Sequence, residues 1–344
     1  MDEYIEQDCR EYISRIDLSP LNGKTVLITG ANGLIGTYLI YMLHLANTDA
    51  NAGINIEAVS RGLPNMALSE IFEKRYTFHS VDLNTPGVLK LFQKADYIFH
   101  GATYAQPGKF LRNYLDTLHL NTIVTEQLLK KAQEDNAAFI FMSSSEIYGE
   151  PDAANIPTSE EFPGLCSTVN IRAIYSEAKR MGETLCYAYR DYEGVDAKIA
   201  RISMTYGPGV TARDERVLAQ FIRQALAKGK ITMLDSGSKI RTFCYIADCT
   251  LMLLHIMLYG TELVYNVGGK ESISIRQLAE EICNITGSRL SVESCPQANA
   301  EKVKVSPQHV QLDITKVCAE FGLRDFKPIS EGLRRTIEWN NTVL

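Results

Sequence analysis

Short apolar runs alternate with longer segments in which apolar residues recur every three or four positions along the first two hundred residues. Short runs rich in β-branched and aromatic residues predict buried strands, whereas the longer periodic segments predict helices. The predicted strands are 26–28, 54–59, 76–80, 97–100, 139–142 and 198–202, and the predicted helices include 37–45, 113–133 and 173–192. This alternation predicts an α/β fold with a doubly wound parallel sheet and helices on both faces.

The stretch TVLITGANGLIG, residues 25–36, carries the first chemical signal. The strand ends at Gly30, where a tight turn favours a residue without a Cβ. Gly33 would let backbone N–H groups approach a pyrophosphate, and Gly36 would let the following helix pack closely on the sheet. The order of strand, glycine turn and helix therefore predicts a Rossmann-like dinucleotide-binding domain.

The pattern loosens after residue 202, where we predict helices over 217–227 and 275–286 and a strand over 231–234. We divide the chain into an N-terminal helical extension of accessory character, a Rossmann domain and a smaller α/β substrate domain that partly interleaves with the sheet near 263–268. The boundaries of the three parts are 1–22, 23–202 and 203–344.

Composition narrows the function classes. The 344 residues are 45% hydrophobic and carry a formal charge of −6 without a basic cluster, so we expect no nucleic-acid partner. Acidic residues precede any apolar run at the N-terminus, and the longest apolar stretch, 251–258, is too short to span a bilayer. We therefore expect a cytoplasmic protein that does not bind a membrane. The eight cysteines are scattered without a C-x-x-C pair, which predicts reduced thiols and no metal site.

A tyrosine and a lysine one helical turn apart form the next candidate. In YSEAK, Tyr175 and Lys179 would share one face of the helix. A nearby ammonium favours phenolate, so we predict that Lys179 lowers the pKa of Tyr175 and makes it a general base; the alternative is an exposed pair on a solvated face. The strand 139–142 runs into three serines in FIFMSSSEIYG, whose hydroxyls would face the same crevice.

These motifs, in this order, resemble the extended short-chain dehydrogenases of the nucleotide-sugar epimerase, dehydratase and decarboxylase family. The resemblance runs from about Lys24 to at least Asp248. It implies a nucleotide-sugar substrate, a nicotinamide dinucleotide cofactor and hydride transfer at C4 of the sugar. Further family-like pieces are Asp82-Leu83, His100-Gly101-Ala102, Asn121, Arg201, Tyr206-Gly207-Pro208 and Arg241-Thr242-Phe243.

The resemblance also implies roles for single residues. Ser144 would hydrogen-bond the 4-hydroxyl of the sugar, Tyr175 would take its proton, and Lys179 would hold the nicotinamide ribose. Glu146 stands where decarboxylases and 4,6-dehydratases carry a catalytic glutamate; the alternative is an exposed turn carboxylate. The expected cofactor contacts are Gly30, Asn32, Gly33, Leu34, Ile35, Gly36, Ser60, Arg61, Asp82, Leu83, Gly101 and Ala102, together with Tyr175 and Lys179.

Arg172, three residues before Tyr175, resembles an arginine of UDP-glucuronate decarboxylases. A guanidinium grips a carboxylate through paired N–H donors; the alternative is a solvated arginine at a helix start. Met204 and Gln106 depart from the family pattern, which usually has asparagine and a small residue there. The expected substrate contacts are Gln106, Ser145, Arg172, Met204, Arg216 and Arg241.

The leading prediction is an enzyme that oxidises C4 of a UDP-hexuronate and then decarboxylates it, closest in pattern to UDP-xylose synthase. A 4,6-dehydratase and a 4-epimerase are alternatives within the family. A dinucleotide-binding sensor without catalysis is the alternative from another class.

Cofactor choice and assembly complete the expectations. Ser60 and Arg61 replace the aspartate that usually accepts from the adenosine ribose, and an arginine can meet a 2′-phosphate. An enzyme that re-reduces its own substrate starts from oxidised cofactor, whose cytoplasmic pool is mainly NAD, so we predict NAD and keep NADP as the alternative. In this family the helices equivalent to 113–133 and 172–192 pair across a two-fold axis, which implies a homodimer through a four-helix seam.

Overall fold

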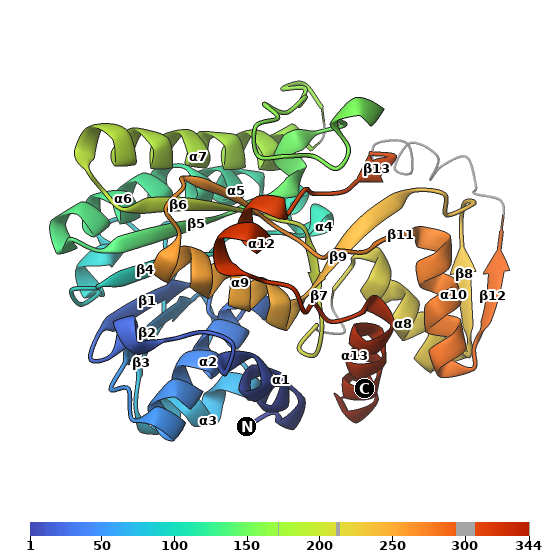
Figure 1. The fold of residues 1–344 in the computed structure, drawn as a ribbon, viewed down its shortest axis with the longest axis horizontal. Coiled ribbons are helices and arrows are strands. Elements are labelled where there is room, and N and C mark those ends of the chain that lie inside the picture. The colour runs from blue at the N-terminus through green and yellow to red at the C-terminus, as the bar shows by residue number, and fades with distance from the viewer. Residues whose placement is uncertain (171, 211–213, 294–306, 344) are drawn as a thin grey trace.

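The computed structural model describes residues 1–170, 172–210, 214–293 and 307–343. A seven-stranded parallel sheet in the order β10-β6-β5-β4-β1-β2-β3 forms its centre (Figure 1). Its strands are β1 (Thr25–Thr29), β2 (Asn55–Ser60), β3 (Thr77–Ser80), β4 (Tyr97–His100), β5 (Ala138–Ser144), β6 (Ala197–Ile202) and β10 (Val264–Val267). The strand order reverses between β1 and β4, which places a crevice at the carboxyl ends of these strands. The predicted doubly wound parallel sheet is confirmed.

Helices cover both faces of the sheet (Figure 1). One apolar core lies between the sheet and α5 (Tyr114–Asn121), α6 (Ile123–Asp135) and α7 (Ala173–Glu193). The other lies between the sheet and α2 (Leu34–Ala50) and α9 (Ile246–Tyr259), with α3 (Met66–Lys74) packed on α2. The single helix predicted over 113–133 is two helices, because the backbone leaves the helical region at Thr122 (φ −124°, ψ −76°).

The part of the chain after residue 202 builds the far wall of the crevice. A small sheet combines β7 (Met204–Tyr206), β9 (Ile240–Tyr245), β11 (Ser272–Ser274) and β13 (His309–Val310). Beside it, β8 (Lys230–Met233) pairs with β12 (Arg289–Val292) under α8 (Val217–Lys228) and α10 (Ile275–Thr286). β10 joins the edge of the large sheet beside β6, which is the interleaving expected near 263–268, and α9 packs on a face of that sheet. The domain boundaries stay a prediction. The remaining helices of the described ranges are α1 (Glu3–Ile13), α4 (Pro107–Arg112), α12 (Thr315–Phe321), α13 (Ile329–Val343), η1 (Ser19–Leu21), η2 (Val88–Leu91), η3 (Ser145–Tyr148) and η4 (Ala153–Asn155).

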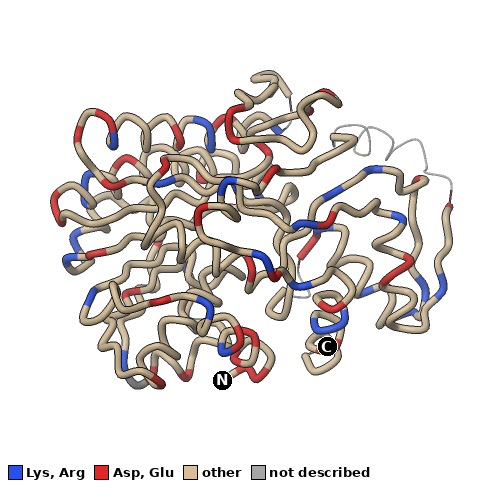
Figure 2. The backbone as a smooth tube through the Cα atoms, viewed as in Figure 1, with Lys and Arg blue, Asp and Glu red and all other residues tan. Residues whose placement is uncertain are grey.

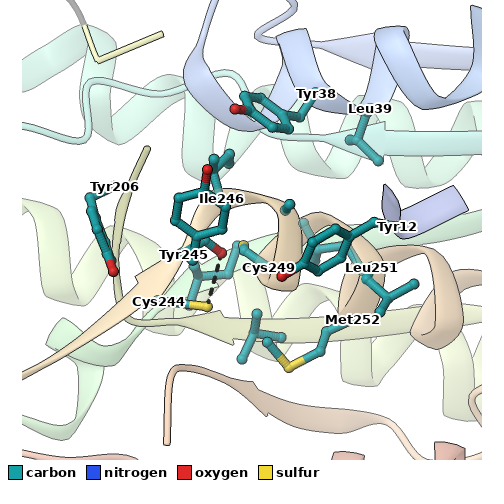
Figure 3. Close-up of a cluster of buried hydrophobic side chains, with 14 of the residues drawn as sticks. Tyr12, Tyr38, Leu39, Tyr206, Cys244, Tyr245, Ile246, Cys249, Leu251 and Met252 are labelled. Atoms are coloured by element: carbon teal, nitrogen blue, oxygen red, sulfur yellow. Dashed lines mark hydrogen bonds between the residues drawn. The ribbon is translucent and has the colours of Figure 1, made fainter. Parts of the chain in front are cut away.

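The N-terminal helix α1 is part of the core, rather than the accessory extension that the sequence predicts. Asp8 on α1 is fully buried and accepts hydrogen bonds from Tyr38 of α2 (2.9 Å), Tyr245 of β9 (2.5 Å) and Arg335 of α13 (2.8 Å). The rings of Tyr38 and Tyr245 lie in one buried cluster with Tyr12 of α1 (Figure 3). One carboxylate therefore ties α1 to the glycine-turn helix and to two elements from beyond residue 202.

Replacing Asp8 with alanine is expected to lower the free energy of unfolding by about 3 kcal/mol, because Arg335 and two phenols lose their buried acceptor. Thermal and denaturant unfolding of the purified variant measure the loss. As a control, Tyr38→Phe removes one donor and leaves the ion pair, so its loss should be about 1 kcal/mol. Equal stability of parent and Asp8→Ala would contradict a structural role for α1.

Acidic and basic residues are interspersed along the described chain (Figure 2). Within the described ranges, no helix combines the length and the apolar character needed to cross a membrane.

Candidate active site

A cavity of about 1480 Å³ opens at the carboxyl ends of the parallel strands, between the large sheet and the part of the chain after residue 202. Drug-sized ligand pockets have volumes of roughly 300–1,000 Å³, so this cavity has room for more than one such molecule. It is lined by all but one of the residues that the sequence predicts for the site. The exception is Lys179.

The glycine turn forms one end of the cavity. Gly30 has φ +77°, and a Cβ on it would lie 2.7 Å from the carbonyl oxygen of Gly101; a Cβ on Gly36 would lie 2.6 Å from that of Gly30. Gly33 is the N-cap of α2 and offers no side-chain cap, so the first N–H groups of α2 are left for a ligand. This cradle fits the pyrophosphate of a dinucleotide. Asn32, Leu34 and Ile35 line the cavity beside it.

The buried side chain of His100 holds the backbone beside the glycine turn in place through Thr29. Gly101 and Ala102 donate their backbone N–H groups to Oγ1 of Thr29 (3.2 and 3.3 Å), which also bonds Nδ1 of His100 at 2.8 Å. Burial, with Lys179 nearby, lowers the pKa of His100 to about 3, so the ring is neutral. Nε2 of His100 lies 3.1 Å from the Leu120 carbonyl oxygen, and a hydrogen bond to that oxygen requires the ring proton on Nε2. Nδ1 is therefore unprotonated and accepts a hydrogen bond from the Thr29 hydroxyl.

The opposite side of the glycine turn is formed by the ends of β2 and β3. Ser60, Arg61, Asp82 and Leu83 all line the cavity there. The Arg61 guanidinium donates to the Tyr104 hydroxyl and lies 4.5 Å from the centre of that ring. The sequence analysis missed Tyr104. Its only signal is its position after the carboxyl end of β4, in the segment that borders the crevice.

Tyr175 and Ser144 line the same cavity, as the sequence predicts, but the pKa prediction for Tyr175 is wrong. Burial and the charge of Glu146 raise the pKa of Tyr175, and a hydrogen bond with the Ser144 side chain opposes them. The phenol is only 5% exposed and its ring stacks on Phe110. In this environment desolvation outweighs the attraction of nearby cations.

Lys179 makes its hydrogen bond to β5 and not to Tyr175 within the described part of the chain. Its ammonium donates to the Met142 carbonyl oxygen at 2.5 Å and lies 4.5 Å from the centre of the Phe141 ring, so the side chain is held against β5. It is 1% exposed, and burial lowers the pKa of Lys179 to about 7 against the pull of Glu183. Although the two residues are one helical turn apart, Tyr175 lines the cavity and Lys179 does not.

Glu146 and Arg172 bind each other. Glu146 lies in η3, where Ser144 caps its N–H (3.2 Å), and Arg172 is the N-cap residue of α7. The guanidinium donates through Nε to Oε2 at 3.1 Å and through Nη2 to Oε1. Burial and Arg172 lower the pKa of the nearby Arg241 to about 10, while Glu146 opposes that shift. The sequence predicts both residues in the site but not their pairing.

The remaining predicted substrate contacts line the far wall. Arg216 is paired with Asp214, Nη2 to Oδ2 at 2.5 Å, and Arg241 donates to the carbonyl oxygens of Pro307 (2.6 Å) and Ile240 (2.7 Å). Gln106 accepts from the Glu215 N–H at 3.4 Å. Met204 in β7 and Ser145 in η3 also line the cavity. Asp214 and Glu215, which stand directly before Arg216, were missed by the sequence analysis.

Among the described residues, no cluster of three or more His, Cys, Asp or Glu side chains is arranged to hold a metal ion. Seven of the eight cysteines are free thiols in the described ranges, and Cys295 lies outside them.

The chain belongs to the NAD dependent epimerase/dehydratase family, whose sequence profile matches residues 26–268. The match begins in β1 and ends just after β10, so it spans the whole parallel sheet. This confirms the predicted family and the NAD-dependent class to which it belongs.

Two of the curated relatives that the chain resembles are decarboxylases. UDP-glucuronic acid decarboxylase 1 of Danio rerio is 32% identical over 323 residues, which cover 94% of this chain and 74% of that protein. UDP-glucuronic acid decarboxylase 6 of Arabidopsis thaliana is 29% identical over 308 residues, which cover 90% of this chain and 86% of that protein.

Solved structures with other activities share the fold. The UDP-glucuronic acid 4-epimerase of Bacillus cereus, in complex with UDP-glucuronic acid and NAD, has a TM-score of 0.78 at 23% identity and covers 93% of this chain and 100% of its own. The dTDP-glucose 4,6-dehydratase DesIV of Streptomyces venezuelae, with NAD bound, has a TM-score of 0.79 at 20% identity over 92% and 97% of the two chains. These likenesses confirm the Rossmann-type architecture.

Proposed function

We propose that this chain oxidises C4 of a UDP-hexuronate and releases its C6 carboxylate as CO₂. The observation that carries the proposal is the Arg172–Glu146 pair, which lies in the same cavity as Ser144 and Tyr175. This placement puts a carboxylate-binding guanidinium within one helical turn of the base. The identity of 32% to a UDP-glucuronic acid decarboxylase over 94% of the chain supports the same substrate class.

The cradle at Gly30, Gly33 and Gly36 would hold the pyrophosphate of NAD, which supplies the acceptor for the C4 hydride. Ser144 holds the 4-hydroxyl oxygen, and Tyr175 takes its proton as the ketone forms. The C6 carboxylate is then that of a β-keto acid, so the electron pair of its C–C bond moves into the C4 carbonyl as CO₂ leaves. Arg172 and Arg241 orient the departing carboxylate, and the enolate takes a proton at C5 from water that Glu146 relays.

One observation favours a 4,6-dehydratase as the second candidate. Glu146 lies beside Ser144, where its carboxylate could remove the proton on C5 once C4 is a ketone. A neutral hexose with a C6 hydroxyl would be the substrate in that case.

Mass spectrometry of the products from a panel of nucleotide sugars tests the proposal. Loss of CO₂ from UDP-glucuronate is the expected result. Loss of water from a neutral sugar nucleotide would select the dehydratase, and a change of stereochemistry without a change of mass would select the epimerase. A protein that binds dinucleotide and turns over none of the panel would fit the sensor.

Replacing Arg61 with aspartate is expected to weaken NADP binding roughly tenfold more than NAD binding. A carboxylate repels a 2′-phosphate but accepts from ribose hydroxyls, and the exposure of Arg61 keeps the effect moderate. Calorimetric titration of parent and variant gives both dissociation constants. Arg61→Gln, which removes the charge without adding one, is the control. Equal changes for the two cofactors would place Arg61 away from the ribose.

We also propose the homodimer. Exposed apolar side chains collect on α5 to α7, the elements predicted for the four-helix seam, and a second copy of this surface would cover them. These side chains are Tyr114, Leu115, Ile123, Met181, Tyr187 and Tyr192.

Sedimentation at micromolar concentration is expected to show a dimer for the parent protein and a monomer for Leu115→Glu. Met66, which is exposed on α3, provides the matched control: Met66→Glu should leave the dimer intact. A monomeric parent would contradict the seam.

We also propose a cytoplasmic location, because the pool of oxidised NAD from which the reaction would start is mainly cytoplasmic.

A further inference from the structure

Phe110 is a residue without an assigned role that contacts the centre of the site. It lies on α4, is 1% exposed, and stacks on the ring of Tyr175 with centroids 4.9 Å apart and planes 11° from parallel. The Arg172 guanidinium lies 5.9 Å from the centre of the same ring. Phe110 is therefore the one described side chain with a ring contact to both Tyr175 and Arg172.

We propose that Phe110 is a positioning residue, which fixes the plane of the Tyr175 phenol and the direction of the Arg172 guanidinium for the reaction. An offset stack at this distance restricts rotation of the tyrosine ring and excludes water from one of its faces. The hydroxyl is thereby held in the cavity that Ser144 also lines, where hydrogen bonding to the Ser144 side chain works against the raised pKa of Tyr175. Small errors in this geometry are costly, since a 1 Å misplacement can reduce the rate about 100-fold.

The stack of Phe110 on Tyr175 also contributes to the raised pKa of Tyr175. Burial is the largest cause of the raised pKa of Tyr175, and Phe110 is the aromatic ring that covers it. Removing the ring admits water, which stabilises phenolate and lowers the pKa of Tyr175. The contact with Arg172 extends the role to the substrate carboxylate, and that extension alone rests on the proposed function.

Nitration by tetranitromethane tests the proposal without any substrate, because the reagent attacks accessible phenolate. Mass spectrometry of the peptide that carries Tyr175 should show nitration roughly tenfold faster in Phe110→Ala than in the parent, the effect of about one pKa unit. Phe110→Tyr keeps the stack and should restore protection. Phe92→Ala, which removes a buried ring of the same core away from Tyr175, is the matched control and should nitrate like the parent.

Turnover supplies the second readout. With UDP-glucuronate, kcat of Phe110→Ala should fall at least roughly tenfold and its pH profile should move to lower pH, while Phe92→Ala keeps the parent profile. If Phe110→Ala does not fold, Phe110→Leu takes its place. Unchanged nitration, or a lower kcat with an unmoved pH profile, would overturn the positioning role. If the parent does not turn over UDP-glucuronate, the proposed function fails and the nitration result still decides the role of Phe110.

Discussion

Tyr175→Phe is expected to lower turnover by roughly two orders of magnitude or more, the usual contribution of a positioned general base. The substitution removes one hydroxyl and keeps the ring that stacks on Phe110, so the fold should survive. Product formation under saturating substrate measures the loss. Dissociation constants for NAD and for the nucleotide sugar, together with thermal unfolding, are the controls and should change little.

The raised pKa of Tyr175 predicts how the rate depends on pH. A base must be deprotonated, so a raised pKa means that the rate of the parent enzyme rises with pH over the range in which the protein is stable. Tyr175→Phe should lose that rise along with the rate. A variant that retains parental activity, or retains the same pH profile at lower activity, would show that another group is the base.

The sequence predicted the parallel sheet because short apolar strands alternate with periodic helical segments along the first two hundred residues, and this alternation is typical of a sheet covered by helices on both faces. It predicted the turn at Gly30 for a local reason, since a positive φ and a backbone contact with Gly101 both exclude a side chain. Local chemistry of this kind is visible in the residues themselves. The break at Thr122 is not, because nothing in a continuous amphipathic pattern marks it.

The sequence predicted which residues line the cavity, but it did not predict which of them contact each other. Tyr175, Ser144 and Glu146 reach the cavity because strand ends and helix starts meet there in a doubly wound fold. Whether Lys179 faces Tyr175 or Met142 depends on how far α7 sits from β5, which helical spacing does not determine. The stack on Phe110 depends in the same way on the path of α4, a six-residue helix without a periodic signal.

Variants of Arg172 and of Glu146 should have different effects, because the two residues act in different steps of the proposed reaction. In the structure Glu146 occupies the guanidinium that a uronate carboxylate would bind. Arg172→Ala should therefore raise KM for UDP-glucuronate by roughly 30-fold, the effect of about 2 kcal/mol, the lower end for a charge pair that is only partly buried. KM or Kd for a neutral sugar nucleotide should change little, because that ligand has no carboxylate to lose.

Glu146→Gln should act in the opposite direction on binding. The amide keeps the shape of the side chain but competes less well for Arg172, so KM for UDP-glucuronate should fall or stay level. Hydride transfer needs Ser144 and Tyr175, whereas loss of CO₂ also needs the carboxylate aligned with the C4 carbonyl and a proton returned to C5. We therefore expect Glu146→Gln to slow CO₂ release more than NADH formation.

Rapid-quench detection of CO₂ alongside absorbance at the NADH band follows both steps in one experiment, and the double variant Arg172→Ala/Glu146→Gln completes the cycle. If the two residues act through their contact, the effects of the single variants on KM will not add. Arg172→Lys is the matched control, since it keeps a charge but loses the paired donors, and should recover only part of the affinity. Should Arg172→Ala bind and process UDP-glucuronate as the parent does, the guanidinium does not hold the substrate carboxylate. The dehydratase, which uses Glu146 and needs no carboxylate on the sugar, would then be the better account of this site.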